Sequence, residues 1–201
     1  EFKSRVETGS ALKSHNWLFE CVDVLEYEIP HDIFHKTDVV CCMLAMHYFA
    51  NSTAALTKFF NLVSDALTAG GTFVAVYPDP DAIASLLMAA PQVNELYVEH
   101  VGGVFGVDAR IENVEQYKNQ ETESLLYNFS LDGTMTRVPE NLITTPMLVA
   151  ALADAGLTLC ESINLQDINA NDIRRCMNLR GPIDRDAAEL LRVYKAIRVT
   201  K

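Results

Sequence analysis

Short apolar runs alternate with segments of helical periodicity in the first half of the chain. Residues 17–30, WLFECVDVLEYEIP, predict a strand that ends near Val24 and leads into an acidic loop. Residues 37–46, TDVVCCMLAM, form a continuous apolar run, which is typical of a central strand covered on both faces. Residues 71–80, GTFVAVYPDP, predict the next strand, which two prolines stop at its end.

Two further segments carry helical patterns. In residues 52–71 the apolar positions recur at intervals of three and four residues, with Ser52 or its neighbour as the N-cap and Gly70 at the end. Residues 81–100 also predict a helix, with a break near Pro91. Strand, helix and strand therefore follow one another, as they do in a parallel α/β sheet.

The pattern becomes more antiparallel in the second half of the chain. Strands are predicted at 102–112 and, as a hairpin that turns on LDGT, at 123–143. A helix over 146–156 ends at a glycine, and further strands follow at 157–165 and 189–201. This order of elements predicts an open α/β sheet with an antiparallel edge.

Length and composition are those of a soluble globular protein. Of the 201 residues, 49% are hydrophobic and 21% charged, so residues 1–201 are expected to form a single domain with a sizeable core. No apolar run approaches the roughly 20 residues that span a bilayer, so no membrane partner is expected. The five cysteines form no CxxC pair, so zinc is not expected, and reduced thiols fit the cytosol or the nucleus.

The charge balance restricts the kind of nucleic acid that the chain can bind. The 27 acidic residues outnumber the 16 lysines and arginines, which gives a net charge of −11. Proteins that grip long nucleic acids through their phosphates usually carry a basic patch, so neither DNA nor an extended RNA groove is expected. A small site that reads one base or nucleotide remains compatible with this charge.

A histidine and a tyrosine stand side by side where the apolar run 37–46 ends. His47 and Tyr48 lie in MLAMHYFANS, residues 43–52, just ahead of a helical pattern. Ligands of open α/β sheets bind outside the carboxyl ends of the strands, so the pair is a candidate binding site. The alternative is a half-buried aromatic pair that closes the core.

The order of these motifs resembles that of the messenger-RNA cap guanine-N7 methyltransferases. The similarity runs from about Phe19 to Lys201 and includes LAMHYFANS, then GGTFVAVYPD, then FSLDG, VPENLI and TPMLVAALADAGLTL, the last three being the more specific part. The resemblance implies a Rossmann-like class I methyltransferase sheet with an antiparallel edge hairpin. It also implies S-adenosyl-L-methionine as the cofactor and the capped 5′ end of RNA, GpppN, as the substrate.

The chemistry of this family needs few catalytic groups. Guanine N7 carries an in-plane lone pair, so it can attack the methyl group of S-adenosyl-L-methionine without a general base. Proximity and orientation alone lower a barrier by roughly 7–11 kcal/mol. The sequence accordingly contains no recognisable catalytic triad or metal-ligand cluster, and we expect no catalytic residue in the strict sense.

Five residues match positions of the family's guanine pocket. In the family the His47 and Tyr48 positions lie against the guanine. The Glu140 position, in VPENLI, faces its Watson–Crick edge, where a carboxylate accepts from N1–H and the N2 amino group. The Tyr194 position borders the pocket and the Pro78 position shapes its wall. Each residue also has a structural alternative. His47 and Tyr48 would form a capped strand end, and Glu140 would be an exposed glutamate at the end of the hairpin. Tyr194 would pack across neighbouring strands, and Pro78 would simply terminate its strand.

Two residues match positions near the family's cofactor. Asp23 matches the aspartate that meets the adenine amino group, its alternative being a loop aspartate that begins a turn. Met43 stands where family members often have a glutamine. A catalytic member carries a glycine-rich loop, D-x-G-x-G-x-G, after its first strand, and no such loop precedes Phe19. We therefore expect a carboxyl-terminal, acceptor-side portion of the enzyme, or a degenerate relative.

Two other functions remain open at this point. One is an inactive methyltransferase-fold subunit that binds a catalytic partner; a glycine-rich loop encoded before Glu1 would argue against it. The other is a small-molecule methyltransferase, which would bind a metabolite in place of capped guanosine. For the cap enzyme we expect a capping-enzyme partner or a fused guanylyltransferase domain. We expect it in the nucleus or cytoplasm, or in a viral factory if the protein is viral.

Overall fold

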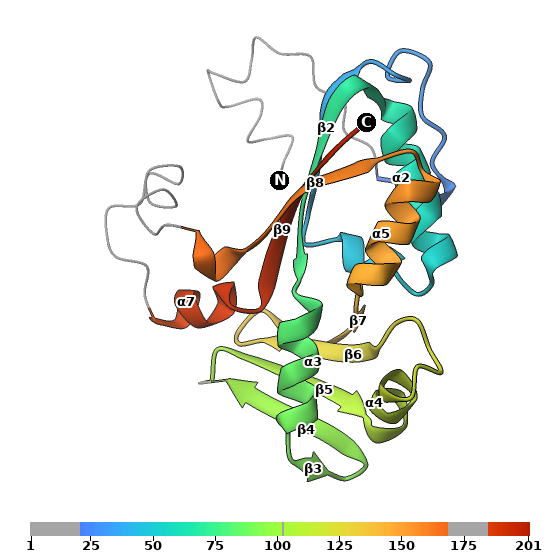
Figure 1. Cartoon of the computed structure of the whole chain (residues 1–201). Coiled ribbons are helices and arrows are strands. Elements are labelled where there is room, and N and C mark those ends of the chain that lie inside the picture. The colour runs from blue at the N-terminus through green and yellow to red at the C-terminus, as the bar shows by residue number, and fades with distance from the viewer. Residues whose placement is uncertain (1–20, 102, 169–184) are drawn as a thin grey trace.

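The structure, a computed structural model, describes residues 21–101, 103–168 and 185–201. Two β-sheets succeed one another along the molecule (Figure 1). The first is a mixed sheet flanked by two helices, and the second is an antiparallel sheet crossed by a third helix. The α/β class predicted from the sequence is thereby confirmed.

The mixed sheet has four strands in the order β1-β2-β9-β8. β1 (Thr37–Met43) runs parallel to β2 (Leu67–Pro78), whereas β9 (Tyr194–Thr200) is antiparallel both to β2 and to β8 (Thr158–Asn164). β1, β8 and β9 fall within the apolar runs from which they were predicted, whereas β2 begins at Leu67, ahead of its predicted run 71–80. The antiparallel edge of this sheet is the pair β8 and β9.

β1 differs from its prediction in one respect. It lies at the edge of the described sheet, and one of its faces is open. Val40 and Cys42 pack against the core, whereas Val39 and Met43 are 55% and 51% exposed. An apolar run cannot by itself separate a central strand from an edge strand, because the strand's second neighbour comes from elsewhere in the sequence.

α2 (Thr53–Ala66) connects the two parallel strands. Ser52 caps it as predicted, because its Oγ accepts the backbone N–H of Ala55 at 3.2 Å. The predicted end at Gly70 is wrong, since Leu67 already begins β2. Gly70 lies within β2 instead, where its φ of +77° serves a bulge in the pairing with β1.

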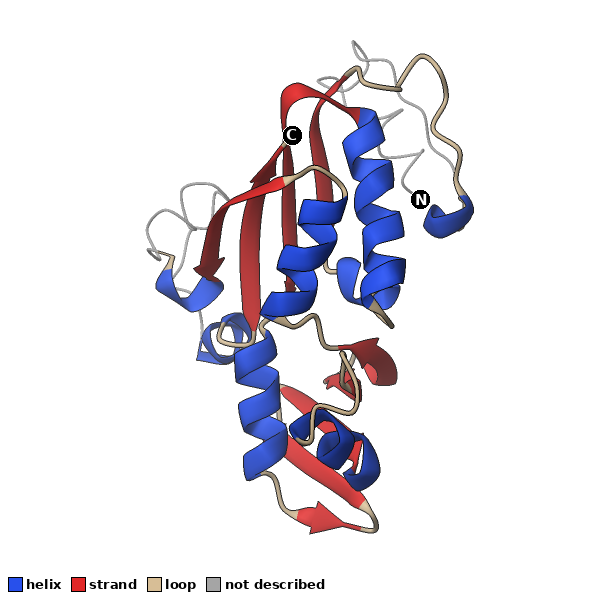
Figure 2. Cartoon of the chain, turned by 45° about the vertical axis from the view of Figure 1, so that its right-hand side comes forward, coloured by secondary structure: helices blue, strands red, loops and turns tan. Residues whose placement is uncertain are grey.

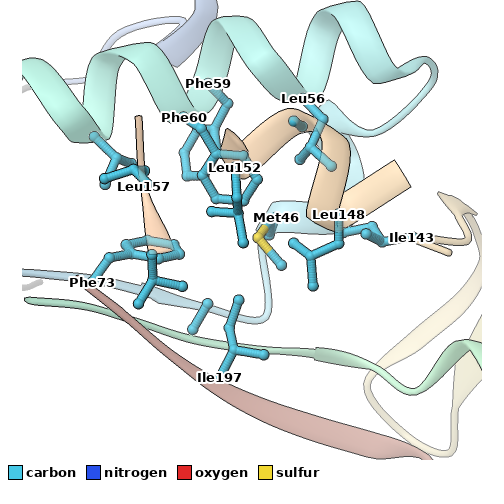
Figure 3. Close-up of a cluster of buried hydrophobic side chains, with 14 of the residues drawn as sticks. Met46, Leu56, Phe59, Phe60, Phe73, Ile143, Leu148, Leu152, Leu157 and Ile197 are labelled. Atoms are coloured by element: carbon cyan, nitrogen blue, oxygen red, sulfur yellow. The ribbon is translucent and has the colours of Figure 1, made fainter. Parts of the chain in front are cut away.

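α2 and α5 (Thr145–Asp154) lie side by side on one face of the mixed sheet (Figure 2). A hydrophobic core fills the space between the helices and the sheet (Figure 3). Phe60 of α2 meets Phe73 of β2 edge to face, with ring centroids 5.8 Å apart, and Leu148 of α5 packs into the same core. These contacts fix the helices on the sheet and so fix the end of β1.

The second sheet is antiparallel, with the order β3-β4-β5-β6-β7. The hairpin predicted on LDGT forms as its last two strands, and it belongs to this separate sheet rather than to the edge of the mixed one. The bounds are Gln92–Val93, Leu96–Val101, Phe105–Arg110, Leu126–Leu131 and Met135–Asn141 for β3 to β7 in order.

Helices and short turns complete the described chain. α3 (Pro80–Ala89) and α4 (Ile111–Lys118) pack on the second sheet, and α7 (Arg185–Leu191) precedes β9. Of two 3₁₀ turns, η1 (Val24–Glu26) contacts α2 and η3 (Leu165–Asp167) contacts β9. Within the described ranges, none of the helices has the length and apolar character needed to cross a bilayer.

The strand predicted to end near Val24 is wrong over residues 21–24, because 21–23 are irregular and Val24 begins η1; its earlier part lies outside the described residues. The side chain of Asp23 accepts the backbone N–H of Leu25 at 3.0 Å. This local bond caps the 3₁₀ turn η1 and competes with an extended strand.

Two further predictions are corrected between residues 81 and 118. The helix predicted to 100 ends at Ala89, two residues before Pro91, and Asn94 and Glu95 then turn the chain with positive φ into the hairpin of β3 and β4. α4 has no predicted counterpart, because Val114 is its single buried residue and the apolar periodicity of a packed helix is missing.

Each sheet has its own buried cluster, and the two sheets meet where β2 ends and β9 begins. There the backbone N–H of Asp79 donates to the carbonyl of Val193 at 2.8 Å. The prediction that residues 1–201 form a single domain stays a prediction.

We expect Leu148→Ala to lower the free energy of unfolding by about 2–5 kcal/mol, because it opens a cavity under α5. Val149, its neighbour on the same helix, is 49% exposed, so Val149→Ala should change stability by less than about 0.5 kcal/mol. Urea denaturation followed by circular dichroism measures both. Equal losses in the two variants would contradict the described packing of α5.

Candidate functional site

The 3₁₀ turn η2 (Met46–Phe49) carries the pair His47 and Tyr48. β1 ends at Met43, and Leu44 follows with a φ of +55°, which turns the chain across the end of the mixed sheet. η2 there contacts both β2 and β7 (Figure 1). The pair therefore follows the carboxyl end of a strand, as predicted, and it lies at the junction of the two sheets.

Glu140 of β7 and His47 form a buried polar pair. Glu140 is 3% exposed and His47 is 2% exposed. Nε2 of His47 lies 3.4 Å from Oε1 of Glu140, but neither ring nitrogen has a hydrogen-bond partner among the described residues. An unpaired buried polar group costs roughly 1–3 kcal/mol. Since native structures keep few such groups, the imidazole is a candidate contact for a ligand.

Tyr127 holds the other oxygen of this carboxylate. It lies on β6 directly opposite Glu140, and its hydroxyl donates to Oε2 at 2.6 Å. Burial raises the pKa of Tyr127 well above its ordinary value, and the nearby charge of Glu140 and the hydrogen bond raise it further. The phenol therefore stays protonated and remains a donor to Glu140.

Two further tyrosines border the same carboxylate. Tyr48 is 44% exposed, and its ring centroid lies 4.2 Å from that of His47. Tyr194, at the start of β9, meets Phe129 of the second sheet in a T-shaped contact. Burial and then the charge of Glu140 raise the pKa of both phenols. Both hydroxyls stay neutral, so Glu140 faces no competing negative charge from them.

Pro78, the last of the five predicted residues, is linked to the others through strand pairing in the mixed sheet. It is buried at the end of β2 and pairs with Tyr194 in the register of β2 and β9. The next residue, Asp79, caps α3 through its side chain and forms an ion pair with Lys195 at 3.2 Å. Pro78 therefore lies where β2 passes from one sheet to the other.

The structure thus brings together all five residues that the sequence assigns to a guanine site. Glu140 links them, because His47 lies within ion-pair distance of it and its charge acts on Tyr48 and Tyr194, while Pro78 pairs with Tyr194. They come from four separate stretches of the chain. Their individual roles in guanine binding stay predictions.

The two predicted cofactor residues lie outside this cluster. Asp23 is exposed, and its carboxylate caps η1, which packs against α2. Met43 is exposed at the end of β1, on the open face of the strand. In the described parts of the chain, neither side chain has a hydrogen bond or an ion pair with Glu140. Their roles at a cofactor stay predictions.

Sequence reasoning missed Tyr127, and the shape of the hairpin explains why. A two-residue turn at the centre of LDGT would place Tyr127 opposite Val138. In the structure the turn is one residue longer, so that Leu131 pairs with Met135, and a bulge next to Leu131 shifts the register once more. Both changes together bring Glu140 opposite Tyr127, and the sequence pattern predicts neither the longer turn nor the bulge.

The described residues offer an incomplete fit to S-adenosyl-L-methionine. The exposed carboxylate of Asp23 suits the adenine amino group, and the exposed thioether of Met43 offers an apolar contact. No glycine pattern of the form G-x-G occurs in the sequence, so a backbone cradle for the methionine end is missing from it. Among the described residues, no group of three or more potential ligands could hold a metal ion.

Comparisons with known proteins concern the chain as a whole rather than its individual site residues. The chain matches the family model described as "mRNA (guanine-N(7))-methyltransferase domain" over residues 3–183. It is also similar to the mRNA cap guanine-N(7) methyltransferase of Debaryomyces hansenii, with 26% identity over 160 residues. That alignment covers 75% of this chain and 29% of the yeast protein, so the chain spans less than a third of that relative.

Solved structures confirm the fold. An S-adenosylmethionine-dependent methyltransferase from Methanosarcina mazei has a TM-score of 0.53 at 9% identity, covering 99% of this chain and 74% of that one. A provisionally described S-adenosylmethionine-dependent methyltransferase from Listeria monocytogenes has a TM-score of 0.54 at 15% identity, covering 94% and 73%. At these identities the likeness concerns the class I methyltransferase fold alone.

We expect His47→Phe to leave the free energy of unfolding unchanged or to raise it by up to roughly 1–3 kcal/mol, because it removes two buried nitrogens without partners. His31 is exposed, so His31→Phe should change stability by less than about 0.5 kcal/mol. Thermal unfolding measures both. A clear loss of stability in His47→Phe alone would show that the imidazole supports the fold.

Proposed function

Because the chain belongs to the family of mRNA (guanine-N(7))-methyltransferase domains, we propose that it carries the acceptor side of a cap methyltransferase. This part holds the guanine of GpppN while N7 is methylated. One observation carries the proposal: a buried carboxylate, Glu140, stands beside the buried unpaired imidazole of His47 at the junction of the two sheets.

The buried carboxylate suits the Watson–Crick edge of guanine. That edge presents N1–H and the N2 amino group, and each carboxylate oxygen has two acceptor positions. Tyr127 uses one position on Oε2 of Glu140, which leaves acceptors on both oxygens. A charged hydrogen bond is about twice as strong as a neutral one, and low exposure to water strengthens it further. Adenine has no pair of donors at the same place, so the carboxylate selects guanine.

The aromatic side chains suit the faces of the base. Tyr48 is the exposed ring of the cluster, so it is the ring on which a guanine bound to Glu140 would stack. Stacking of a base on an aromatic ring contributes roughly 1–3 kcal/mol. His47 then gains a polar partner for its ring, which removes the cost of leaving the imidazole unpaired. Tyr194 and Pro78 form the neighbouring wall.

Methylation of guanine N7 requires no acid or base catalysis by these side chains. Guanine N7 has a free lone pair, so no residue has to remove a proton before attack. The pocket contributes by fixing the base, and orientation alone lowers a barrier by roughly 7–11 kcal/mol. S-adenosyl-L-methionine supplies the electrophilic methyl group when it is bound. Because the chain lacks a glycine cradle for it, we derive no step through the cofactor.

We expect Glu140→Gln to weaken binding of GpppA by roughly ten- to a hundred-fold. The amide presents a donor toward a guanine donor, and a lost charged hydrogen bond costs about 1.5–3 kcal/mol. The preference over the inosine-capped analogue, which lacks the N2 amino group, should shrink with it. Isothermal titration of the chain with both cap analogues measures these affinities.

Glu115→Gln is the matched control. Glu115 also accepts a tyrosine hydroxyl, that of Tyr97 at 3.2 Å, but it lies on the surface helix α4. The control should keep both the affinity and the preference. If Glu140→Gln behaves like the control, Glu140 does not read the base, and the function proposed for this cluster is wrong.

We expect the 201-residue chain to bind S-adenosyl-L-methionine weakly or not at all, because no glycine-rich loop of the family pattern lies within it. Calorimetry with S-adenosyl-L-methionine measures this directly. Micromolar affinity would contradict the expectation and would mean that another segment replaces the loop. In that case Asp23→Asn should weaken the binding if Asp23 meets the adenine amino group.

A further inference from the structure

We propose that Tyr127 is a positioning residue that fixes the carboxylate of Glu140 for reading guanine. This inference rests on the proposed function and assigns the orientation of the base-reading carboxylate to Tyr127. Tyr127 itself is 1% exposed, so it acts through Glu140 from behind.

The hydrogen bond between these two side chains is short and enclosed. The hydroxyl of Tyr127 donates to Oε2 of Glu140 at 2.6 Å, with both residues buried. Hydrogen bonds to an ionised acceptor are the strong ones, and O–H···O⁻ distances of about 2.5–2.7 Å are typical of them. A glutamate side chain otherwise turns freely about its last bond. The phenol therefore selects one orientation of the carboxylate.

His47, the other neighbour of the carboxylate, does not fix its orientation. Nε2 of His47 lies 3.4 Å from Oε1, but it does not form a hydrogen bond with it. Among the described residues, Oε1 is therefore held only by the orientation that Tyr127 imposes through Oε2. This division leaves Oε1 for a base donor while Oε2 keeps a second acceptor position.

The backbone supports this geometry. Tyr127 and Glu140 are direct partners across β6 and β7, where opposite side chains lie close together on one face. Ser124, three residues before Tyr127, donates from its hydroxyl to the carbonyl of Leu142 at 2.8 Å. The two strands are thus tied on the side of the pair that lies away from the turn.

The test compares Tyr127→Phe with Tyr97→Phe. Both variants keep the ring and remove a hydroxyl that donates to a glutamate, but Tyr97 donates to Glu115 at 3.2 Å, on the helix α4. In Tyr127→Phe we expect the guanosine-to-inosine preference, measured with GpppA and its inosine-capped analogue, to fall by about 3- to 10-fold. The preference of Tyr97→Phe should match that of the wild-type chain.

The outcomes separate this proposal from the proposed function. An unchanged preference in Tyr127→Phe, with the preference lost in Glu140→Gln, overturns the role of Tyr127 and leaves the base reader in place. A wild-type chain without any guanosine preference overturns both. Crystal structures of the two variants add a readout without ligand: the carboxylate of Glu140 should turn in Tyr127→Phe, and an unmoved carboxylate overturns the proposal.

One measurement on the wild-type chain needs no substitution, should Tyr127→Phe fail to fold. A buried phenol that donates to a carboxylate exchanges its proton slowly with water, so Tyr127 should give a resolved hydroxyl resonance. GpppA should shift this resonance more than the inosine-capped analogue does. The absence of the resonance, or equal shifts with both analogues, overturns the proposal.

Discussion

The candidate site depends on one constraint, that a carboxylate is kept away from water at the junction of two sheets. A buried charge is costly unless donors compensate it, and here Tyr127 supplies a donor at 2.6 Å. Burial, and after it the charge of Glu140, raises the pKa of Tyr48 and Tyr194 above the ordinary value of a phenol, so both remain neutral beside the carboxylate. Removing the carboxylate would change the electrostatics of every side chain around it.

The fold could be predicted where local patterns decide it. The apolar runs of β1, β2, β8 and β9 and the capped helix α2 follow from periodicity and from Ser52, and all of them form. Tertiary context decides the rest. An apolar run does not show whether β1 lies at the centre or at an edge, and the single buried residue of α4 leaves no periodic signal. Pro91 marked the end of a helix, but the hairpin after it depends on the left-handed pair Asn94 and Glu95.

The candidate site, too, could be predicted only in part from the sequence. A motif resemblance selects His47, Tyr48, Glu140 and Tyr194, because the residue types stay at fixed places in the sequence. It does not show that the imidazole lacks partners or that the carboxylate is enclosed. Both properties arise from packing between η2 and the second sheet, which no local pattern encodes.

The bulge in β7 has a consequence for how the length of this hairpin can vary. Side chains alternate along a strand, so a residue inserted or lost beside Glu140 would turn its carboxylate to the opposite face. The longer turn and the bulge both lie nearer the tip, between Leu131 and Val138. A one-residue change in length there would therefore shift the register and move Glu140 away from its place opposite Tyr127. The length of the turn and the bulge is thus part of what builds the site, although neither contains a residue of it.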